Sequence, residues 1–249
     1  MALLSIIVPT YNEAENIGRL VGRIADAFAG LDHELVFIDD STDGTDKILA
    51  DLARRAPRIR VVHRAVRSGL ASAVIDGVAV AQGDLLCVLD ADLQHPPEIL
   101  PRLFRAMQDT EADLAIGSRY IPGGRSDFTI VRRVISRGAI ALAQILLRRA
   151  RSVSDPVSGL FAFRRRVVEG IALRPLGYKI LLEILVRGKL SKVVEVPYHF
   201  EARLAGHSKL TMSQNWTYLR HVLRLWKGQP FSPPLARVTF PDTPPLREA

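Results

Sequence analysis

The sequence predicts an α/β fold: one domain built around a doubly wound, mostly parallel sheet. Two observations support this prediction. Strand-like and helix-like segments alternate through the first 118 residues, and such alternation gives parallel strands joined by right-handed crossovers. In addition, 249 residues with 48% hydrophobic content suffice for one large core but are few for two ordinary enzyme domains.

Five short apolar runs are typical of buried parallel strands, because turn-forming or acidic residues bound them. They are residues 4–9, 34–39, 59–63, 85–90 and 113–117. Four segments between them have the spacing of helices, namely 13–27, 45–54, 70–81 and 97–108. Pro97 suits the first turn of the last of these helices, where a missing N–H costs little.

The second half predicts amphipathic helices and then a tail. Residues 134–147 are apolar on nearly every side and arginines flank them, so two interpretations stay open: a helix at a membrane interface or a buried core helix. Residues 218–226 form an amphipathic pattern, with Trp216 and Trp226 placed to reach lipid headgroups. We expect the domain to span residues 1–227 and the proline-rich residues 228–249 to be extended or disordered.

The charge of +8 is unevenly distributed along the chain. Residues 1–118 hold 11 Lys+Arg and 18 Asp+Glu, a net charge of −7, whereas residues 119–249 hold 23 and 8, a net charge of +15. The basic half therefore predicts an anionic partner, either acidic lipid headgroups or a phosphorylated substrate, since no nucleic-acid-binding module is present.

Two features indicate the cellular compartment: the single Cys87 and the lack of a long apolar run. One cysteine excludes an intramolecular disulfide and favours a reducing compartment, with Cys87 itself an inert core thiol. No apolar run reaches the roughly 18 to 20 residues that span a bilayer, and residues 3–8 are too short for a signal peptide. We expect a cytoplasmic protein that touches a membrane surface.

Polar residues follow three of the predicted strands: Thr10 to Glu13, Asp39 with Asp40, and Asp90 with Asp92. The carboxyl ends of parallel strands form the usual ligand crevice of this architecture. Asp90 and Asp92 are two residues apart on an extended segment, so both carboxylates point the same way and suit a hard divalent cation. The alternative is a solvated acidic loop. No glycine-rich dinucleotide or P-loop motif is present.

Several segments resemble the dolichol-phosphate mannose synthases, which are inverting nucleotide-sugar glycosyltransferases with the GT-A fold. The opening segment 5–13, the second loop 39–45 and the Asp90–Asp92 pair are similar to the general glycosyltransferase pattern. The narrower resemblance lies in segments 90–98, 117–120, 132–139, 154–159 and 203–210. These segments occur in order over roughly residues 3 to 225, and the second loop is one residue shorter than usual.

The resemblance implies roles in binding the donor and a metal. Asp90, Asp92 and Gln94 are expected to hold Mg²⁺ or Mn²⁺ against the donor diphosphate, although Gln94 could instead cap a helix. The donor nucleotide is expected to contact nine residues. They are Pro9, Tyr11, Glu13, Asp39, Asp40, Ala91, Arg203, Ser208 and Lys209.

The resemblance also implies an acceptor-phosphate subsite of Arg119, Arg132, Arg133 and Ser136. The alternative for Arg119 is a structural salt bridge. Asp92, Arg119, Arg132 and Arg203 are the expected catalytic residues. A phosphate monoester is mostly a dianion at neutral pH, so it attacks without a general base. His95 is accordingly expected to order its loop and not to bind metal.

These features predict metal-dependent transfer of a hexose, with inversion, to a polyprenyl (dolichyl) phosphate at the cytoplasmic face of a membrane. Residues 1–118 would bind the nucleotide sugar and residues 119–227 would face the acceptor lipid. GDP-mannose is the expected donor, and UDP-glucose is the alternative. A small membrane-anchoring subunit is a further expected partner. A non-catalytic scaffold that binds anionic membranes is the alternative from another functional class.

Overall fold

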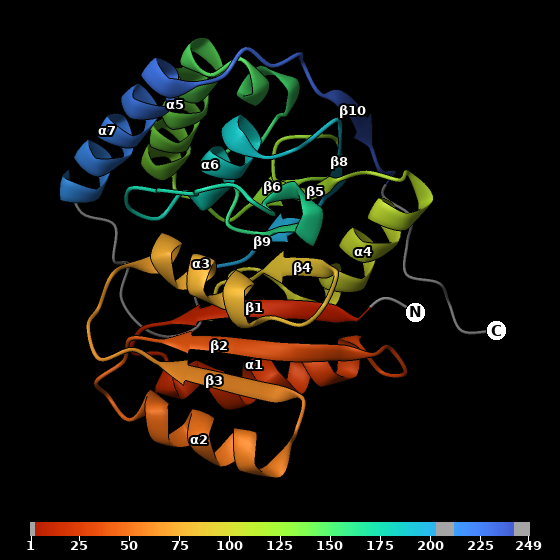
Figure 1. The fold of residues 1–249 in the computed structure, drawn as a ribbon, viewed down its shortest axis with the longest axis vertical. Coiled ribbons are helices and arrows are strands. Elements are labelled where there is room, and N and C mark those ends of the chain that lie inside the picture. The colour runs from red at the N-terminus through yellow and green to blue at the C-terminus, as the bar shows by residue number, and fades with distance from the viewer. Residues whose placement is uncertain (1–2, 203–211, 242–249) are drawn as a thin grey trace.

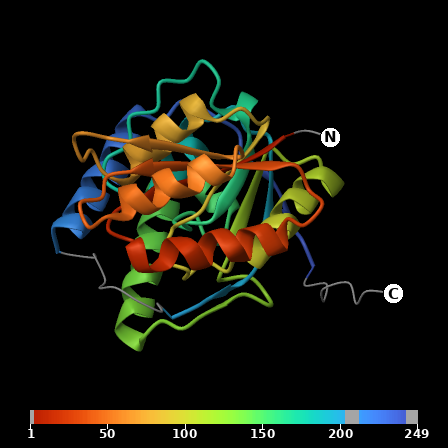
Figure 2. The same ribbon diagram turned by 90° about the horizontal axis from the view of Figure 1, so that it is seen from below.

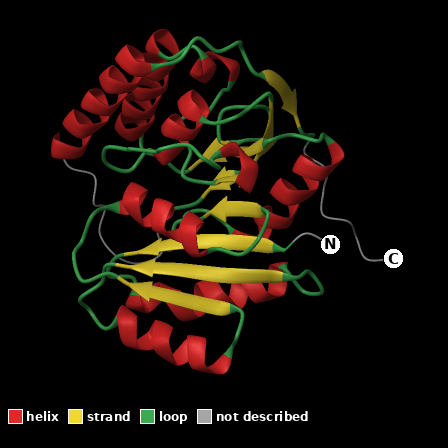
Figure 3. Ribbon diagram, in the orientation of Figure 1, coloured by secondary structure: helices red, strands yellow, loops and turns green. Residues whose placement is uncertain are grey.

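The computed structural model describes residues 3–202 and 212–241. One eight-stranded sheet, in the order β10-β8-β5-β7-β4-β1-β2-β3, runs through the molecule, and helices cover both of its faces (Figures 1 and 3). The elements of the first half are β1 Leu4–Thr10, α1 Ala14–Ala27, β2 His33–Asp39, α2 Thr45–Arg55, β3 Ile59–His63, α3 Leu70–Val80, β4 Leu85–Val88, α4 Leu100–Asp109 and β5 Leu114–Ser118. Each predicted strand and helix of this half is therefore confirmed within a few residues.

The second half adds shorter strands and three helices. They are β6 Arg125–Ser126, α5 Ile130–Leu146, β7 Phe161–Arg164, α6 Ile180–Arg187, β8 Lys192–Pro197, β9 His199–Phe200, α7 Met212–Gly228 and β10 Ala236–Thr239. β6 and β9 pair with each other outside the main sheet. β7 lies antiparallel between β4 and β5, whereas the other paired strands of the main sheet are parallel.

The register of the central strands brings their carboxyl ends together. β1 pairs with β2 from Leu4 opposite His33 to Thr10 opposite Asp39, and β4 pairs with the other edge of β1. In Figure 1 the arrowheads of β1, β2 and β3 point to the side of the molecule on which α5 and α7 lie. The polar segments that follow β1, β2 and β4 consequently meet at one edge of the sheet.

The sheet is buried on both faces, which explains its near-continuous apolar strands. One face packs against α1, α2 and α4 through residues such as Leu20, Leu49 and Leu103. The other face packs against α3 and α6 through residues such as Val74 and Ile184. Cys87 is fully buried in the first of these clusters, and burial raises the pKa of its thiol, so its prediction as an inert core residue is confirmed.

Part of the proline-rich segment after residue 227 contributes to the fold as an extended strand. Ala236–Thr239 forms β10, which pairs in parallel with β8 at the edge of the sheet. Leu235 is buried, and Phe240 packs against the core. The prolines precede a short β-branched segment, and an edge strand tolerates such neighbours because only one of its sides needs ladder hydrogen bonds.

α5 and α7 pack on each other and on α6 around a third cluster that includes Ile140, Ala143 and Val222. Figure 2 shows this helix pair at the side of the molecule opposite α4. α5 nevertheless leaves much of its apolar surface uncovered, with Ile130, Val131, Val134, Ile135 and Ile145 each more than half exposed. One face of the helix is therefore core, while its open face leaves the membrane-interface interpretation as a prediction. Over the described ranges, no helix has the length and apolarity needed to cross a bilayer.

Candidate active site

A cavity of about 350 Å³ opens at the carboxyl ends of the central strands. Its lining comes from widely separated parts of the chain, including the loops after β1, β2 and β4, the N-terminal turns of α3 and α5, the loop before α6, and one side of α7. The predicted site residues in this lining are Pro9, Tyr11, Glu13, Asp40, Asp90, Ala91, Asp92, Gln94, Arg119 and Arg132. The predicted convergence of strand ends is therefore confirmed as a shared cavity.

Tyr11 and Arg67 form one wall of this cavity. The Arg67 guanidinium lies 3.7 Å from the centre of the Tyr11 ring, which is cation–π geometry. Glu13 lies beside them, and its Oε2 accepts a hydrogen bond from Asn16 Nδ2 at 2.7 Å. This wall offers an aromatic face, a carboxylate and a guanidinium, which are the groups that recognise a flat nucleobase and its ribose.

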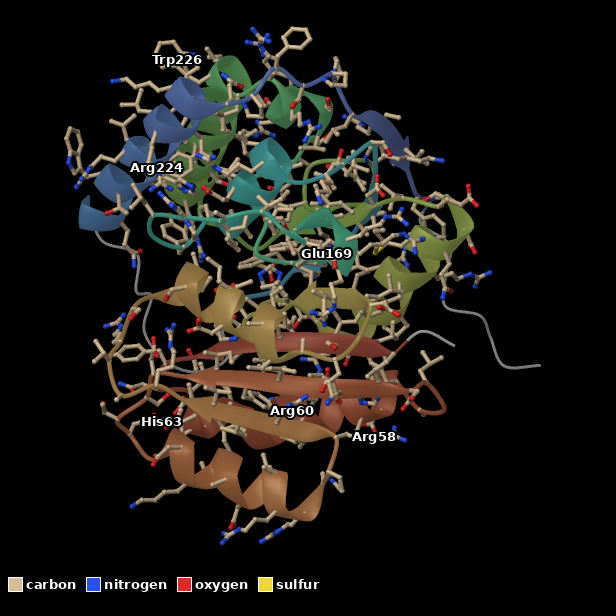
Figure 4. The ribbon with its side chains drawn as sticks, viewed as in Figure 1. Arg58, Arg60, His63, Glu169, Arg224 and Trp226 are labelled. Atoms are coloured by element: carbon tan, nitrogen blue, oxygen red, sulfur yellow. The ribbon has the colours of Figure 1, made fainter. Side chains whose placement is uncertain are left out.

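The two adjacent acids at the end of β2 have different environments. Asp39 is fully buried and lies outside the cavity lining, where its oxygens accept hydrogen bonds from Thr10 (2.7 Å), Ser41 (2.5 Å) and His63 (2.8 Å). His63 stands at the carboxyl end of β3, where Figure 4 labels it. Asp40 does line the cavity, but it is paired with Arg64, whose Nε lies 2.7 Å from Asp40 Oδ1.

Asp43, in the same shortened loop, bonds Thr45, the first residue of α2. Its Oδ1 accepts hydrogen bonds from the backbone and hydroxyl of Thr45, at 3.0 and 2.6 Å. Burial by itself raises the pKa of Asp43, but the hydrogen bonds from Thr45 and from the Ala14 amide outweigh burial and lower it. The loop is thus held by its own acid, with Asp40 next to the cavity.

The loop that holds Asp90, Asp92 and Gln94 turns sharply at Leu93. Leu93 has φ of 59°, a left-handed conformation that residues other than Gly, Asn and Asp rarely adopt, and its side chain is buried. Such a conformation costs on the order of 1–3 kcal/mol and clusters at functional sites. At this turn the backbone N–H of Gln94 donates a hydrogen bond to Asp92 Oδ1 at 3.1 Å.

The donor atoms of this loop fit a hard divalent cation. Asp90 and Asp92 offer carboxylate oxygens at the cavity wall. The Gln94 side chain donates through Nε2 to the Glu201 carbonyl at 3.2 Å, which leaves its amide oxygen as an acceptor. The described residues contain no group of three or more His, Cys, Asp or Glu side chains placed to hold a metal, so substrate oxygens and water would complete the coordination.

His95 and Gly159 both lie close to the Asp90 carboxylate. His95 is buried, with Nδ1 3.0 Å from the Tyr198 hydroxyl and Nε2 3.5 Å from Asp90 Oδ2, so it orders its loop as predicted. A Cβ on Gly159 would lie 2.9 Å from Asp90 Oδ2 and 3.0 Å from His95 Nε2. Gly159 is therefore required for the approach of its loop to Asp90, and the Ser-Gly pair in segment 154–159 was its only signal in the sequence.

Arg119 forms the salt bridge that was the alternative for it, while still lining the cavity. Its Nε and Nη2 donate to Asp155 at 2.7 and 2.8 Å, and both side chains are buried. Burial alone would lower the pKa of Arg119, but the Asp155 carboxylate outweighs burial and raises it. The charge of this arginine is consequently balanced within the protein.

The predicted acceptor residues of α5 are divided between the cavity and the surface. Thr129 caps the helix by accepting a hydrogen bond from the Arg132 amide at 3.3 Å. The Arg132 guanidinium lies 4.2 Å from the Phe128 ring centre and faces the cavity. Arg133 is exposed, and Ser136 accepts a hydrogen bond from the Tyr120 hydroxyl at 2.8 Å; neither belongs to the cavity lining.

Lys179, together with Gly177 and Tyr178, lines the cavity from the loop before α6, and the sequence analysis missed all three. Lys179 Nζ donates to the Val157 carbonyl at 2.6 Å. Burial, and then the nearby Arg119, lowers the pKa of Lys179 to about 8. Gln214 and Thr217 of α7 complete this side. Arg203, Ser208 and Lys209 lie outside the residues that the structure describes.

Sequence and structure comparisons agree with this geometry. The model of the family described as glycosyl transferase family 2 matches residues 5–171. The chain is 48% identical over 230 residues to the dolichol-phosphate mannosyltransferase of Pyrococcus furiosus, covering 91% of this chain and 65% of that one. It is 36% identical to the dolichol-phosphate mannosyltransferase of Saccharomyces cerevisiae, covering 89% of this chain and 86% of that one.

Among solved structures, the chain resembles glucosyl-3-phosphoglycerate synthase from Mycobacterium tuberculosis, which was determined with Mn²⁺, UDP and glucosyl-3-phosphoglycerate. The TM-score is 0.67 at 22% identity, and the match covers 93% of this chain and 82% of the other. This likeness concerns the fold and confirms the predicted GT-A architecture.

Proposed function

Because this chain belongs to glycosyl transferase family 2 and, within it, to the dolichol-phosphate mannosyltransferases, we propose that it transfers mannose from GDP-mannose to a polyprenyl phosphate such as dolichyl phosphate. The observation that carries the proposal is one cavity that joins the Asp90–Gln94 loop to Arg132. That cavity offers oxygen donors for a diphosphate-bound cation at one place and a guanidinium for a second phosphate at another. The chain spans 65% of the length of the Pyrococcus relative, so the activity is proposed for the part represented here.

The donor is proposed to lie along the wall made by Tyr11, Glu13 and Arg67, with its diphosphate near Asp90 and Asp92. Asp90, Asp92 and Gln94 would hold Mg²⁺ or Mn²⁺, which when bound neutralises charge that develops on the departing nucleoside diphosphate. Arg203, Ser208 and Lys209 remain predicted donor-phosphate contacts. Asp39 also stays a predicted donor contact, although in this structure its buried carboxylate bonds Thr10, Ser41 and His63 and holds the loop.

The acceptor phosphate is proposed to bind beside Arg132. One of its oxygens forms a bond to the anomeric carbon while the bond from that carbon to the donor diphosphate breaks, and attack from the opposite side inverts the configuration. The phosphate is already ionised at neutral pH, so the chain need not supply a base. Its residues position two anions and keep the sugar between them.

Membrane contact is proposed for the open face of α5. The exposed stripe begins at Ile130, two residues before the cavity-lining Arg132, so a lipid with its phosphate at Arg132 has an apolar surface to follow. Arginines border this stripe and suit an anionic leaflet, proposed here to be the cytoplasmic one. A small membrane-anchoring subunit stays a prediction, which co-purification of a tagged chain from its own membranes tests.

The decisive experiment measures sugar transfer to citronellyl phosphate, a short isoprenyl phosphate. GDP-mannose with Mn²⁺ or Mg²⁺ should give a mannosyl phosphate product, UDP-glucose should give little, and EDTA should abolish the reaction. A preference for UDP-glucose would replace the proposed donor by the alternative. Absence of transfer from both donors, in a folded protein that still sediments with vesicles, would favour the scaffold hypothesis.

A further inference from the structure

We infer that Lys179 is the second cation of the acceptor-phosphate subsite, binding phosphate oxygens opposite Arg132. The inference rests on the proposed function and adds a residue to which the sequence motifs gave no role. Lys179 lines the same cavity as Arg132 and the Asp90–Asp92 loop. It stands at the N-terminal end of α6, so its backbone is fixed by a helix packed into the core.

The charges of the described cavity-lining residues favour a second cation at the acceptor phosphate. The phosphate of a monoester carries about −1.5 to −2 charges at pH 7. Arg119 contributes little net charge, because Asp155 takes two of its hydrogen bonds in a buried salt bridge. Arg132 alone therefore leaves the phosphate partly uncompensated, and Lys179 is the remaining basic side chain on this side of the described cavity.

The contacts of Lys179 leave its charge available to a ligand. Within the described part of the chain, its ammonium group makes one hydrogen bond, to the neutral carbonyl of Val157, although an ammonium has three N–H donors. Arg119 and Arg132 lower the pKa of this group, whereas Asp90 and Asp155 raise it, so all four charges act on Lys179. Lys179 thus shares one cavity with Arg132 of the proposed acceptor subsite and with Asp90 of the proposed metal site.

The position of Lys179 is unfavourable for stability alone. A positive charge at a helix N-terminus opposes the helix dipole, which favours anions there and cations at the other end. Burial further disfavours the charged ammonium and lowers its pKa to about 8. A bound phosphate would offset both costs, because its negative charge interacts favourably with the lysine ammonium and with the helix N-terminus.

The test compares Lys179→Met and Lys179→Gln with a matched control, Lys189→Met. Lys189 also donates to one backbone carbonyl, that of Glu169 at 2.8 Å, but it lies outside the cavity lining. Binding of citronellyl phosphate and of GDP is titrated by calorimetry, and transfer kinetics follow in the full chain. Lys179→Gln keeps a polar N–H donor without the charge, and Lys179→Met keeps the length without the donor, so the pair separates charge from packing.

We expect both Lys179 variants to weaken citronellyl phosphate binding by at least about tenfold, the usual cost of a lost charge-assisted hydrogen bond. Binding of GDP should change less than about twofold. Lys179→Arg should recover part of the loss, and Lys189→Met should match wild type.

Unaltered acceptor binding in Lys179→Gln would overturn the inference, as would an equal loss of GDP binding or unfolding of all three Lys179 variants. If wild type itself binds no citronellyl phosphate, the proposed function fails; if it does bind and only the Lys179 result is negative, the proposed function stands.

Discussion

At the scale of single residues, the site depends on short contacts that leave no room for a larger side chain. Gly159 is the clearest case, because its α-carbon faces both Asp90 and its supporting His95. The region around it is buried and tightly packed, with the His95 ring between Tyr198 and Phe200. Asp90 is thus placed by its neighbours as well as by its own loop.

Gly159→Ala should therefore reduce activity much more than stability. The added methyl group meets Asp90 Oδ2 at 2.9 Å, so the carboxylate must move by several tenths of an ångström. We expect turnover to fall by about one to two decades, because small displacements of a positioned group are costly in catalysis. The folded state should lose only about 1–2 kcal/mol, as typical overpacking does. Transfer assays and urea titration measure the two effects.

Gly138→Ala, at a position where a Cβ meets nothing within 4 Å, is the control. Equal losses of activity in both variants would contradict the account of Gly159.

The adjacent acids Asp39 and Asp40 show what a sequence leaves undecided at this scale. Asp39 ends β2 and Asp40 follows it, and the resemblance implied nucleotide contacts for both. Successive side chains of a strand point to opposite sides, so one acid turns inward to Thr10 and the other reaches the cavity edge. The motif predicted the loop, but which of the two acids lines the cavity depends on neighbours contributed by β1 and β3.

At the scale of elements, the exposed stripe of α5 has a measurable consequence for membrane binding. Ile130, Val134 and Ile145 recur at intervals that place them on one helix face, and nothing in the described structure covers them. Trp216 and Trp226 of the adjacent α7 are also exposed, and Figure 4 labels Trp226 at the outer end of that helix. Such residues suit the boundary between headgroups and acyl chains.

Replacing Val134, Ile135 and Ile145 by Ser should release the protein from vesicles of anionic lipid. Each of these side chains is at least 54% exposed, so the folded state should change by roughly 0.5 kcal/mol or less per site. Their insertion into lipid is worth on the order of 1–2 kcal/mol each, so co-sedimentation should fall at least about tenfold. Val66→Ser, at an equally exposed apolar position on the loop before α3, should leave sedimentation unchanged. Sedimentation of the triple variant at the wild-type level would exclude α5 as the membrane contact.

A second element-scale prediction concerns the carboxylate that joins the starts of β5 and β8. Asp113 accepts hydrogen bonds from Arg166 and from the backbones of Ser191 and Lys192. Burial by itself raises the pKa of Asp113, but these hydrogen bonds lower it to about 2 from an ordinary value of 3.8. Since the folded pKa is the lower one, the stabilisation is complete above pH 3.8 and is lost as pH falls towards 2.

Asp113→Asn should accordingly be less stable than wild type at pH 7, by on the order of 1–2 kcal/mol. The difference in unfolding free energy should shrink between pH 4 and pH 2 and vanish at the acid end, because wild type then carries a neutral side chain as well. Urea titrations of both proteins at several pH values give this difference directly. A difference that stays constant down to pH 2 would assign the effect to packing.

At the scale of the whole molecule, the first half of the fold could be predicted and parts of the second half could not. β1 to β5 are apolar runs with clear ends, so their pattern alone located them. β7 has four residues and inserts antiparallel between β4 and β5, a pairing between segments far apart in the sequence that no local pattern indicates. β10 follows prolines that suggested a tail, and Lys179 belongs to no motif. These features are fixed by long-range contacts, which a local reading does not contain.

The whole-molecule consequence of a shared cavity is that donor and metal should stabilise the entire fold together. The cavity joins loops after β1, β2 and β4 to α3, α5 and α6, so a ligand that fills it binds only the folded chain. At a concentration of about 100 times Kd, such a ligand adds about 2.7 kcal/mol. For a chain of this size each kcal/mol raises Tm by about 2–4 °C, so GDP with Mn²⁺ should raise Tm by roughly 5–10 °C. UDP at the same concentration should raise Tm less.

In Asp92→Asn the Tm shift produced by GDP should no longer depend on Mn²⁺, because the oxygen donors of the Asp90–Gln94 loop are then incomplete. Differential scanning fluorimetry of both proteins, with and without EDTA, measures these shifts. A Mn²⁺-dependent shift that survives in Asp92→Asn would place the cation elsewhere in the cavity.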